Sequence, residues 1–149
     1  MNETADLRIF EDELFTVDHS SSCVVPGYVL VRLKGPATSL SELAPLTAEA
    51  LGRLLSRVTR AIEEAVGADR VYCLSFAELD RRLHFHLFPR TPWLLDEYWR
   101  ATESRNQPIN GPLLFEWART ALAAGGSVPV GAGSVASACA ALRDRLGGG

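Results

Sequence analysis

The segment RRLHFHLFPR, residues 81–90, contains two of the three histidines of the protein. Apolar and polar residues alternate along it, which is typical of a half-buried β-strand. Because successive side chains of a strand point to opposite faces, we expect one face to carry Arg82, His84 and His86. The residues between them are apolar and would pack into the core: Leu83, Phe85 and Leu87.

The chemistry of the predicted polar face suits an anion with several oxygens. An imidazole has an unperturbed pKa of about 6.5 and can be a neutral nucleophile near pH 7. The planar guanidinium of Arg82 matches the geometry of a phosphate. Two alternatives stay open: an incidental pair of histidines on a half-exposed strand, or a metal site that joins His84 and His86 to a thiol or to His19.

Five segments have the length and residue types of β-strands, and turn residues separate them. They are residues 7–10, 14–19, 28–34, 70–79 and 83–88. The last two are separated by a short charged turn and predict an antiparallel hairpin. The order of three strands, a helix, two strands and further helices predicts an α+β fold with an antiparallel sheet of about five strands.

The longest helix is predicted over residues 46–66, where apolar residues recur at steps of three and four along one face. Thr47 is expected to cap its start, and Gly67 to end it in the left-handed conformation. This amphipathic helix would pack on the sheet. Further helices are predicted beyond residue 92, over residues 93–104, 111–123 and 134–146.

The composition indicates a single domain over residues 1–149. Fifteen basic residues against eighteen acidic ones give a net charge of −3, so no basic field favours binding to nucleic acid or to a membrane surface. No secretory leader and no membrane-spanning apolar run are recognisable. The three scattered cysteines form no CxxC pair, which favours a reducing compartment, so we expect the protein in the cytoplasm.

The motif at residues 82–88 resembles the signature His-φ-His-φ-His-φ-φ of the histidine triad family, where φ is apolar. Pro89 and Arg90 follow it, as in many members. The upstream segment VVPGYVLVRLKGPATSLSEL, residues 24–43, and the long helix also resemble the family in order and spacing. The resemblance covers about residues 8–92 as a family core, which leaves residues 93–149 as a C-terminal helical extension.

The resemblance implies a nucleotide hydrolase that cleaves at the α-phosphate of a nucleoside monophosphate joined to a leaving group, of the dinucleoside polyphosphate or phosphoramidate type. By this resemblance His84 attacks the phosphorus and forms a covalent nucleotidyl-histidine. His86 would contact the phosphate oxygens, and its backbone would orient the ring of His84. Arg82 stands where the family has its first histidine, and we expect it to bind phosphate.

The family also implies a ribose contact on the loop after the second strand. Asp18 is the first choice there, because a carboxylate can accept from two neighbouring hydroxyls, and His19 and Ser20 are alternatives. A structural role for Asp18 as the cap of the turn stays open as an alternative. The turn AELDRR, residues 77–82, is shorter than the family loop that carries a glutamine or serine toward the leaving group, and this leaves leaving-group assistance unassigned.

The resemblance further implies a homodimer with a sheet continued across the subunits. The expected ligand is a small-molecule nucleotide, with no cofactor and no metal. Two other functions stay open: a nucleotide-binding or sensing protein with little turnover, and a nucleotidyl transferase. The sequence does not fix the base, the leaving group or the acceptor.

Overall fold

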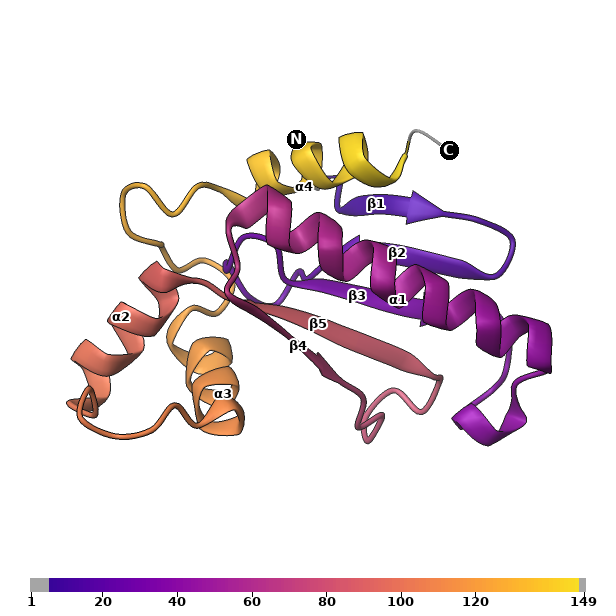
Figure 1. The fold of residues 1–149 in the computed structure, drawn as a ribbon, viewed down its shortest axis with the longest axis horizontal. Helices are drawn as coiled ribbons and strands as arrows, with labels where there is room; N and C mark the ends of the chain where they lie inside the picture. The colour runs from indigo at the N-terminus through magenta and orange to yellow at the C-terminus, as the bar shows by residue number, and fades with distance from the viewer. Residues whose placement is uncertain (1–5, 148–149) are drawn as a thin grey trace.

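A five-stranded antiparallel sheet forms the centre of the computed structural model, which describes residues 6–147 (Figure 1). The strands lie in the order β1-β2-β3-β5-β4, and every neighbouring pair is antiparallel. This confirms the predicted α+β class. Their bounds are β1 Arg8–Glu11, β2 Phe15–His19, β3 Val29–Leu33, β4 Arg70–Leu74 and β5 His84–Arg90.

Four α-helices accompany the sheet, together with one turn of 3₁₀-helix, η1, at Leu40–Glu42. The helices are α1 Pro45–Val66, α2 Pro92–Thr102, α3 Gly111–Ala121 and α4 Val135–Leu146. Each of them was expected within a few residues of these bounds. Within residues 6–147, no helix combines the length and the apolar character needed to cross a bilayer.

The start of α1 differs from the prediction. The N-cap is Ala44, which makes no side-chain capping bond, and Pro45 occupies the first turn, so the expected cap by Thr47 is wrong. Proline suits this position because its fixed φ angle is already helical and its missing N–H would have no partner there. The end is as expected, since Gly67 has φ +68° and its N–H donates to the carbonyl of Glu63.

Strand β4 ends earlier than the predicted run of residues 70–79. It stops at Leu74, and Ala77 in the following loop has φ +54°, in the left-handed region that interrupts an extended chain. The residues after β4 therefore form a loop beside β5 rather than the second half of a long hairpin. This loop carries Phe76, whose side chain is 70% exposed.

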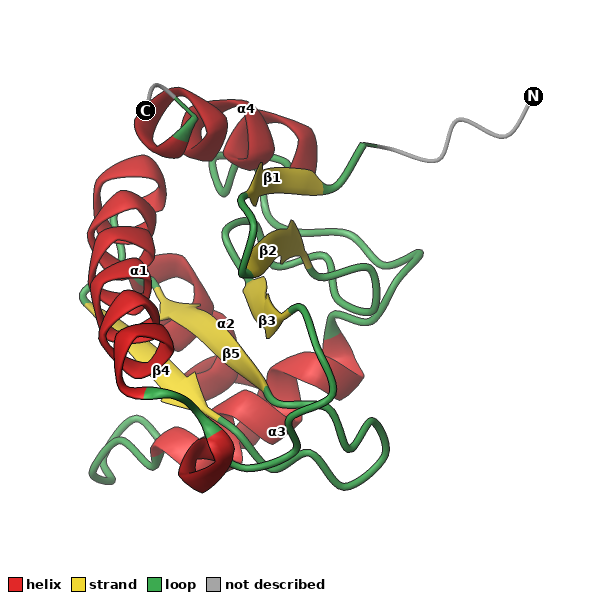
Figure 2. Ribbon diagram, turned by 90° about the vertical axis from the view of Figure 1, so that its right-hand side faces the viewer, coloured by secondary structure: helices red, strands yellow, loops and turns green. Residues whose placement is uncertain are grey.

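One face of the sheet is covered by α1 and α4. Figure 2 shows α1 alongside the strands and α4 next to β1. The buried cluster on this face joins both helices to the strands, and it confirms the predicted inward row of β5. Its members include Val17, Val31, Leu54, Val58, Ile62, Leu83, Phe85, Leu87 and Leu142.

A second buried cluster lies where α2 and α3 pack against the sheet. It joins Tyr28 and Phe88 to Leu94 and Leu114, all of them almost fully buried. Phe88 is two residues after His86 on β5, so both side chains point to the same face. The C-terminal extension is therefore divided, with α4 in the first cluster and α3 beside the histidine-bearing face.

Candidate active site

His84 is held at the start of β5 with one ring nitrogen engaged. Its Nδ1 lies 2.8 Å from the backbone oxygen of Arg82, and because a carbonyl can only accept, Nδ1 donates. Nε2 is then the nitrogen with a free lone pair. The expected orienting group was the backbone of His86, and this is corrected. Strand β5 begins at His84, so the carbonyl of Arg82 lies outside the strand and is available to the ring.

The backbone of His84 is also fixed from the side of β4. The hydroxyl of Ser75, the residue after this strand, donates to the backbone oxygen of His84 over 2.7 Å. Ser75 precedes the turn AELDRR, in which the sequence has no glutamine or serine to assist the leaving group. Its contribution in this structure is to hold the strand, since its hydroxyl is bonded to backbone.

His86 is a neutral imidazole in the folded protein. Burial lowers its pKa to about 4, and electrostatic interactions with His84, Arg119 and Arg32 act in the same direction. The hydroxyl of Tyr28 lies 2.7 Å from Nδ1. When this hydroxyl donates to Nδ1, Nε2 carries the proton and can donate to an anion.

Tyr28 is a site residue that sequence reasoning missed. It is 1% exposed, and burial raises the pKa of its hydroxyl to about 12, which keeps the proton on the oxygen at neutral pH. The register pairs Leu30 with His86, so Tyr28 approaches β5 near Phe88, with the two rings 5.2 Å apart. This register is set by sheet pairing, and the sequence of either strand alone does not reveal it.

Arg82 is turned toward Asp80. Its Nε lies 3.1 Å from Oδ1 and its Nη2 2.9 Å from Oδ2, and the side chain is 68% exposed. The hydrogen bonds from Arg82 hold the pKa of Asp80 at about 2. Arg82 does not line the cavity that contains His84 and His86. Phosphate binding by Arg82 stays a prediction, and the side chain would have to leave Asp80 or share it.

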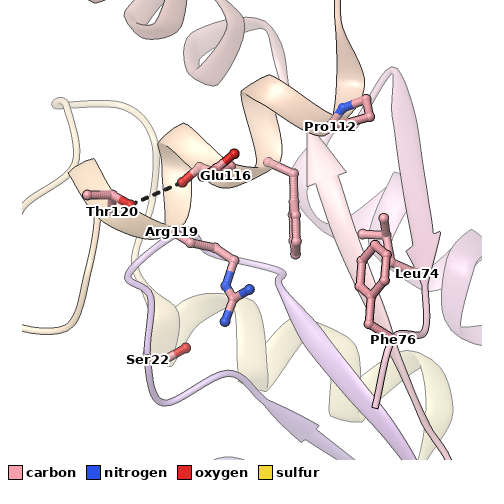
Figure 3. A pocket seen from close by; sticks show the side chains of 8 residues that line it. Ser22, Leu74, Phe76, Pro112, Glu116, Arg119 and Thr120 are labelled. Atoms are coloured by element: carbon pink, nitrogen blue, oxygen red, sulfur yellow. Dashed lines mark hydrogen bonds between the residues drawn. The ribbon is translucent and has the colours of Figure 1, made fainter. Parts of the chain in front are cut away.

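Two neighbouring cavities open on the histidine-bearing face. The smaller, of about 280 Å³, is lined by residues 76–80, His84, His86 and Arg119. The larger, of about 590 Å³, is shown in Figure 3. Phe76 and Arg119 line both cavities. The larger one is lined by Ser22, Leu74, Phe76, Pro112, Phe115, Glu116, Arg119 and Thr120.

Two of the residues predicted to hold a ribose are already engaged within the protein. The carboxylate of Asp18 accepts from Nε of Arg8 over 2.6 Å and lies 3.8 Å from Arg32. His19 is buried, its Nε2 accepts from the N–H of Gly27, and its Nδ1 donates to the carbonyl of Ser20. Neither side chain lines the two cavities.

The third predicted residue, Ser20, is buried and does not line the larger cavity. Its Oγ lies 3.1 Å from Oγ of Ser22, and Ser22 lines that cavity. The loop that was expected to approach a ribose therefore reaches the cavity through Ser22. Three serines in a row give no signal about which one faces outward, because the loop conformation decides it.

The metal alternative lacks ligands among residues 6–147, where no three His, Cys, Asp or Glu side chains are placed to hold one ion. His84 and His86 have their ring centroids 5.2 Å apart. The Nε2 atom of His19 instead accepts a hydrogen bond from the N–H of Gly27. The two histidines of β5 therefore form a pair without a third ligand in this part of the chain.

Solved structures share the fold, although no family model and no curated protein matches the sequence. A histidine triad protein from Bradyrhizobium japonicum is 20% identical over 93% of this chain and 89% of its own, with a TM-score of 0.60. A zinc-bound histidine triad family protein from Mycobacterium smegmatis is 19% identical over 97% and 86%, with a TM-score of 0.59. A hypothetical histidine triad nucleotide-binding protein from Sulfolobus tokodaii is 25% identical over 58% and 61%, with a TM-score of 0.53. The chain therefore has the fold of the histidine triad proteins.

Proposed function

We propose that the protein is a nucleotide hydrolase of the histidine triad type, which cleaves at the α-phosphate through a covalent nucleotidyl-histidine. One observation carries the proposal. His84 donates from Nδ1 to a backbone carbonyl and lines the same cavity as His86, so its second nitrogen is left as a nucleophile. The fold supports this class of activity, and the reaction itself is the proposed part.

In the proposed first step, Nε2 of His84 attacks the α-phosphorus. An N–P bond forms, the bond from phosphorus to the leaving group breaks, and the leaving group departs with the electron pair. Water then attacks the same phosphorus, the N–P bond breaks, and its electron pair returns to Nε2 of His84. The water gives up one proton to the solvent, and a nucleoside monophosphate and the free imidazole result. A second phosphate-bearing molecule in place of water would make the protein a nucleotidyl transferase.

His86 is proposed to donate from Nε2 to an oxygen of this phosphate, with Tyr28 holding the ring from the other side. A neutral imidazole is suited to this task, because it keeps one donor and adds no charge that would repel a cation nearby. Arg82 is proposed as a second phosphate contact at the rim, where Asp80 competes for it.

The nucleoside is proposed to occupy the larger cavity. Its volume of about 590 Å³ lies within the range of roughly 300–1,000 Å³ for small-molecule sites. Phe76 and Phe115 offer apolar walls to a base, and Ser22 offers a hydroxyl from the expected loop. Ribose contacts by Asp18, His19 or Ser20 would require the side chains to leave their present partners, or the backbone to serve instead.

The alternative function is a nucleotide-binding or sensing protein with little turnover. It is favoured by the outward position of Arg82, since the motif then supplies only two groups to the cavity. The two functions differ in whether a covalent adduct forms. Both would bind a small-molecule nucleotide in the same place.

The deciding experiment is intact mass spectrometry after incubation with diadenosine polyphosphates, adenosine phosphoramidates and nucleotide sugars. The hydrolase predicts a nucleotidyl adduct on wild-type protein, none on His84→Asn, and a reduced amount on His86→Asn, which is the matched control on the same strand. Binding without adduct or turnover in wild type would reject the hydrolase. Because a relative with this fold contains zinc, each reaction is repeated after dialysis against a chelator.

We also propose a homodimer in the cytoplasm. Strand β4 lies at one edge of the sheet, so its outer side is available to a second copy. The exposed Cys73 lies in the middle of this edge. A pair of β4 strands around a two-fold axis would continue the sheet from one subunit into the other.

A further inference from the structure

Arg119 lies where the two cavities meet and lines both of them. It lies in the last turn of α3, and within residues 6–147 its guanidinium makes no ion pair or hydrogen bond. Figure 3 shows its side chain pointing away from Glu116 and Thr120 and into the larger cavity. It also lines the smaller cavity with His84 and His86.

One aromatic ring fixes this cation relative to the histidines. The guanidinium carbon of Arg119 lies 5.3 Å from the ring centroid of Phe115, a cation–π contact. The same ring packs edge-on against His86, with centroids 6.1 Å apart and an interplanar angle of 80°. Phe115 is buried, so both groups are held against a rigid wall.

The other arginines near the site have carboxylate partners. Arg82 is paired with Asp80 through two hydrogen bonds, and Arg32 faces Asp18 at 3.8 Å. Arg119 therefore has the most available guanidinium of the three, and its charge reaches His86, whose pKa it helps to lower. The two imidazoles and the guanidinium of Arg119 together form a surface that suits an anion.

We propose that Arg119 binds the non-bridging oxygens of the phosphate attacked by His84, so that α3 supplies the charge expected from Arg82. This inference rests on the proposed function and adds the residue that selects an anionic substrate. During the attack, negative charge is concentrated on the phosphate oxygens, and a guanidinium fixed in advance stabilises it. No proton leaves Arg119, because guanidinium stays charged.

The test measures binding and turnover separately in wild type, Arg119→Met and Arg119→Lys. Arg105→Met is the matched control, since Arg105 also lies over an aromatic ring, that of Trp99, at a distance of 5.0 Å, and lines neither cavity. Calorimetry with adenosine monophosphate, adenosine and inorganic pyrophosphate gives affinities. Loss of one charged hydrogen-bonding partner weakens a phosphate ligand by roughly 10- to 100-fold.

We expect Arg119→Met to weaken the binding of adenosine monophosphate and of pyrophosphate by this factor and to leave the affinity for adenosine unchanged. Arg119→Lys should retain part of the affinity for the two phosphate ligands. Arg82→Met should weaken them less. Equal affinities in wild type and Arg119→Met, or a wild type that binds no phosphate ligand, would overturn the inference. Normal turnover and affinity in Arg119→Met would reject the inference and leave the hydrolase standing. Pyrophosphate binding that depends on Arg119, without any adduct in wild type, would reject the hydrolase and leave Arg119 as a phosphate-binding residue only.

Discussion

The Nδ1 atom of His84 donates to the backbone oxygen of Arg82 over 2.8 Å, so the residue in the first position of the motif orients the proposed nucleophile through its main chain. Any residue supplies a carbonyl there. The departure from a histidine at this position therefore leaves the ring of His84 in place. What the substitution changes is the side chain, which is directed toward Asp80.

Arg82→Ala should consequently preserve the chemistry of His84. We expect adduct formation to persist and kcat/KM to fall by less than about tenfold, the scale of one exposed hydrogen-bonding contact. Steady-state kinetics with the best substrate of the screen measures the effect. A loss as severe as that of His84→Asn would show that the guanidinium itself belongs to the centre of the reaction.

Tyr28→Phe removes the hydroxyl from His86 and keeps the aromatic packing. Without this partner the ring of His86 can rotate, so we expect kcat to fall by roughly 10- to 100-fold, which is less than the roughly 100- to 10,000-fold that a positioned acid–base group itself contributes. The midpoint temperature of thermal unfolding should change only slightly, because the ring still packs on Phe88 and Phe115. Tyr98→Phe, in the same buried cluster, is the control and should retain its activity.

The lowered pKa of His86 predicts a pH-dependent stability. In the unfolded chain its pKa is about 6.5, and in the folded protein it is about 4, because burial and neighbouring positive charges disfavour the imidazolium. Between these values only the unfolded state takes up the proton. The contribution of His86 to the free energy of unfolding should therefore be fully present above pH 6.5 and should decrease as the pH falls toward 4.

Urea unfolding at pH 7.5 and pH 5 measures this loss. In His86→Asn the difference between the two pH values should shrink, since one proton-binding site of the unfolded state is gone. An unchanged difference would assign the loss to other groups, among them the buried His19, whose pKa is also lowered by burial. Nuclear magnetic resonance of the imidazole rings gives the pKa of His86 directly.

Leu142→Ala should destabilise the whole domain, although α4 lies beyond residues 8–92, where the sequence motifs resemble the family. Leu142 is fully buried in the cluster shared by α1 and the sheet. Truncation of a buried leucine costs about 2–5 kcal/mol. Asp144 lies on the exposed side of α4, and the free energy of unfolding of Asp144→Ala should stay within about 0.5 kcal/mol of wild type. Urea titration measures both variants.

Cys73→Arg tests the proposed dimer. A bulky charge at the exposed centre of β4 should prevent two edges from pairing, so light scattering should report a monomer where wild type gives a dimer. Ser56→Arg places the same charge on the exposed side of α1 and should leave the mass unchanged. A wild type that is monomeric at all concentrations would contradict the dimer.

The sequence predicted the elements and the paired histidines because both follow from local patterns. Alternation along residues 83–88 placed Phe85 and Leu87 in the core and His84 and His86 on the opposite face. A three-to-four repeat gave α1. These signals need only neighbouring residues, so one sequence was enough.

Tyr28 and Arg119 could not be predicted, because their roles depend on packing between distant segments. Tyr28 and His86 are 58 residues apart in the chain, and only the pairing of β3 with β5 brings them together. Arg119 has the pattern of any exposed arginine near a helix end. It becomes part of the site through the way α3 packs against Phe88.

The contact between α4 and β1 joins the last helix of the chain to its first strand. Arg143 donates to the backbone oxygen of Arg8 over 2.9 Å, and Cys139, Leu142 and Leu146 share a cluster with Ile9. On the ribosome, β1 leaves the exit tunnel before α4, so the part of its apolar side that α4 covers stays exposed until α4 has been synthesised. The cluster that includes Ile9 is therefore completed only after α4 has been synthesised, and a nascent chain stalled before residue 134 would present β1 to chaperones.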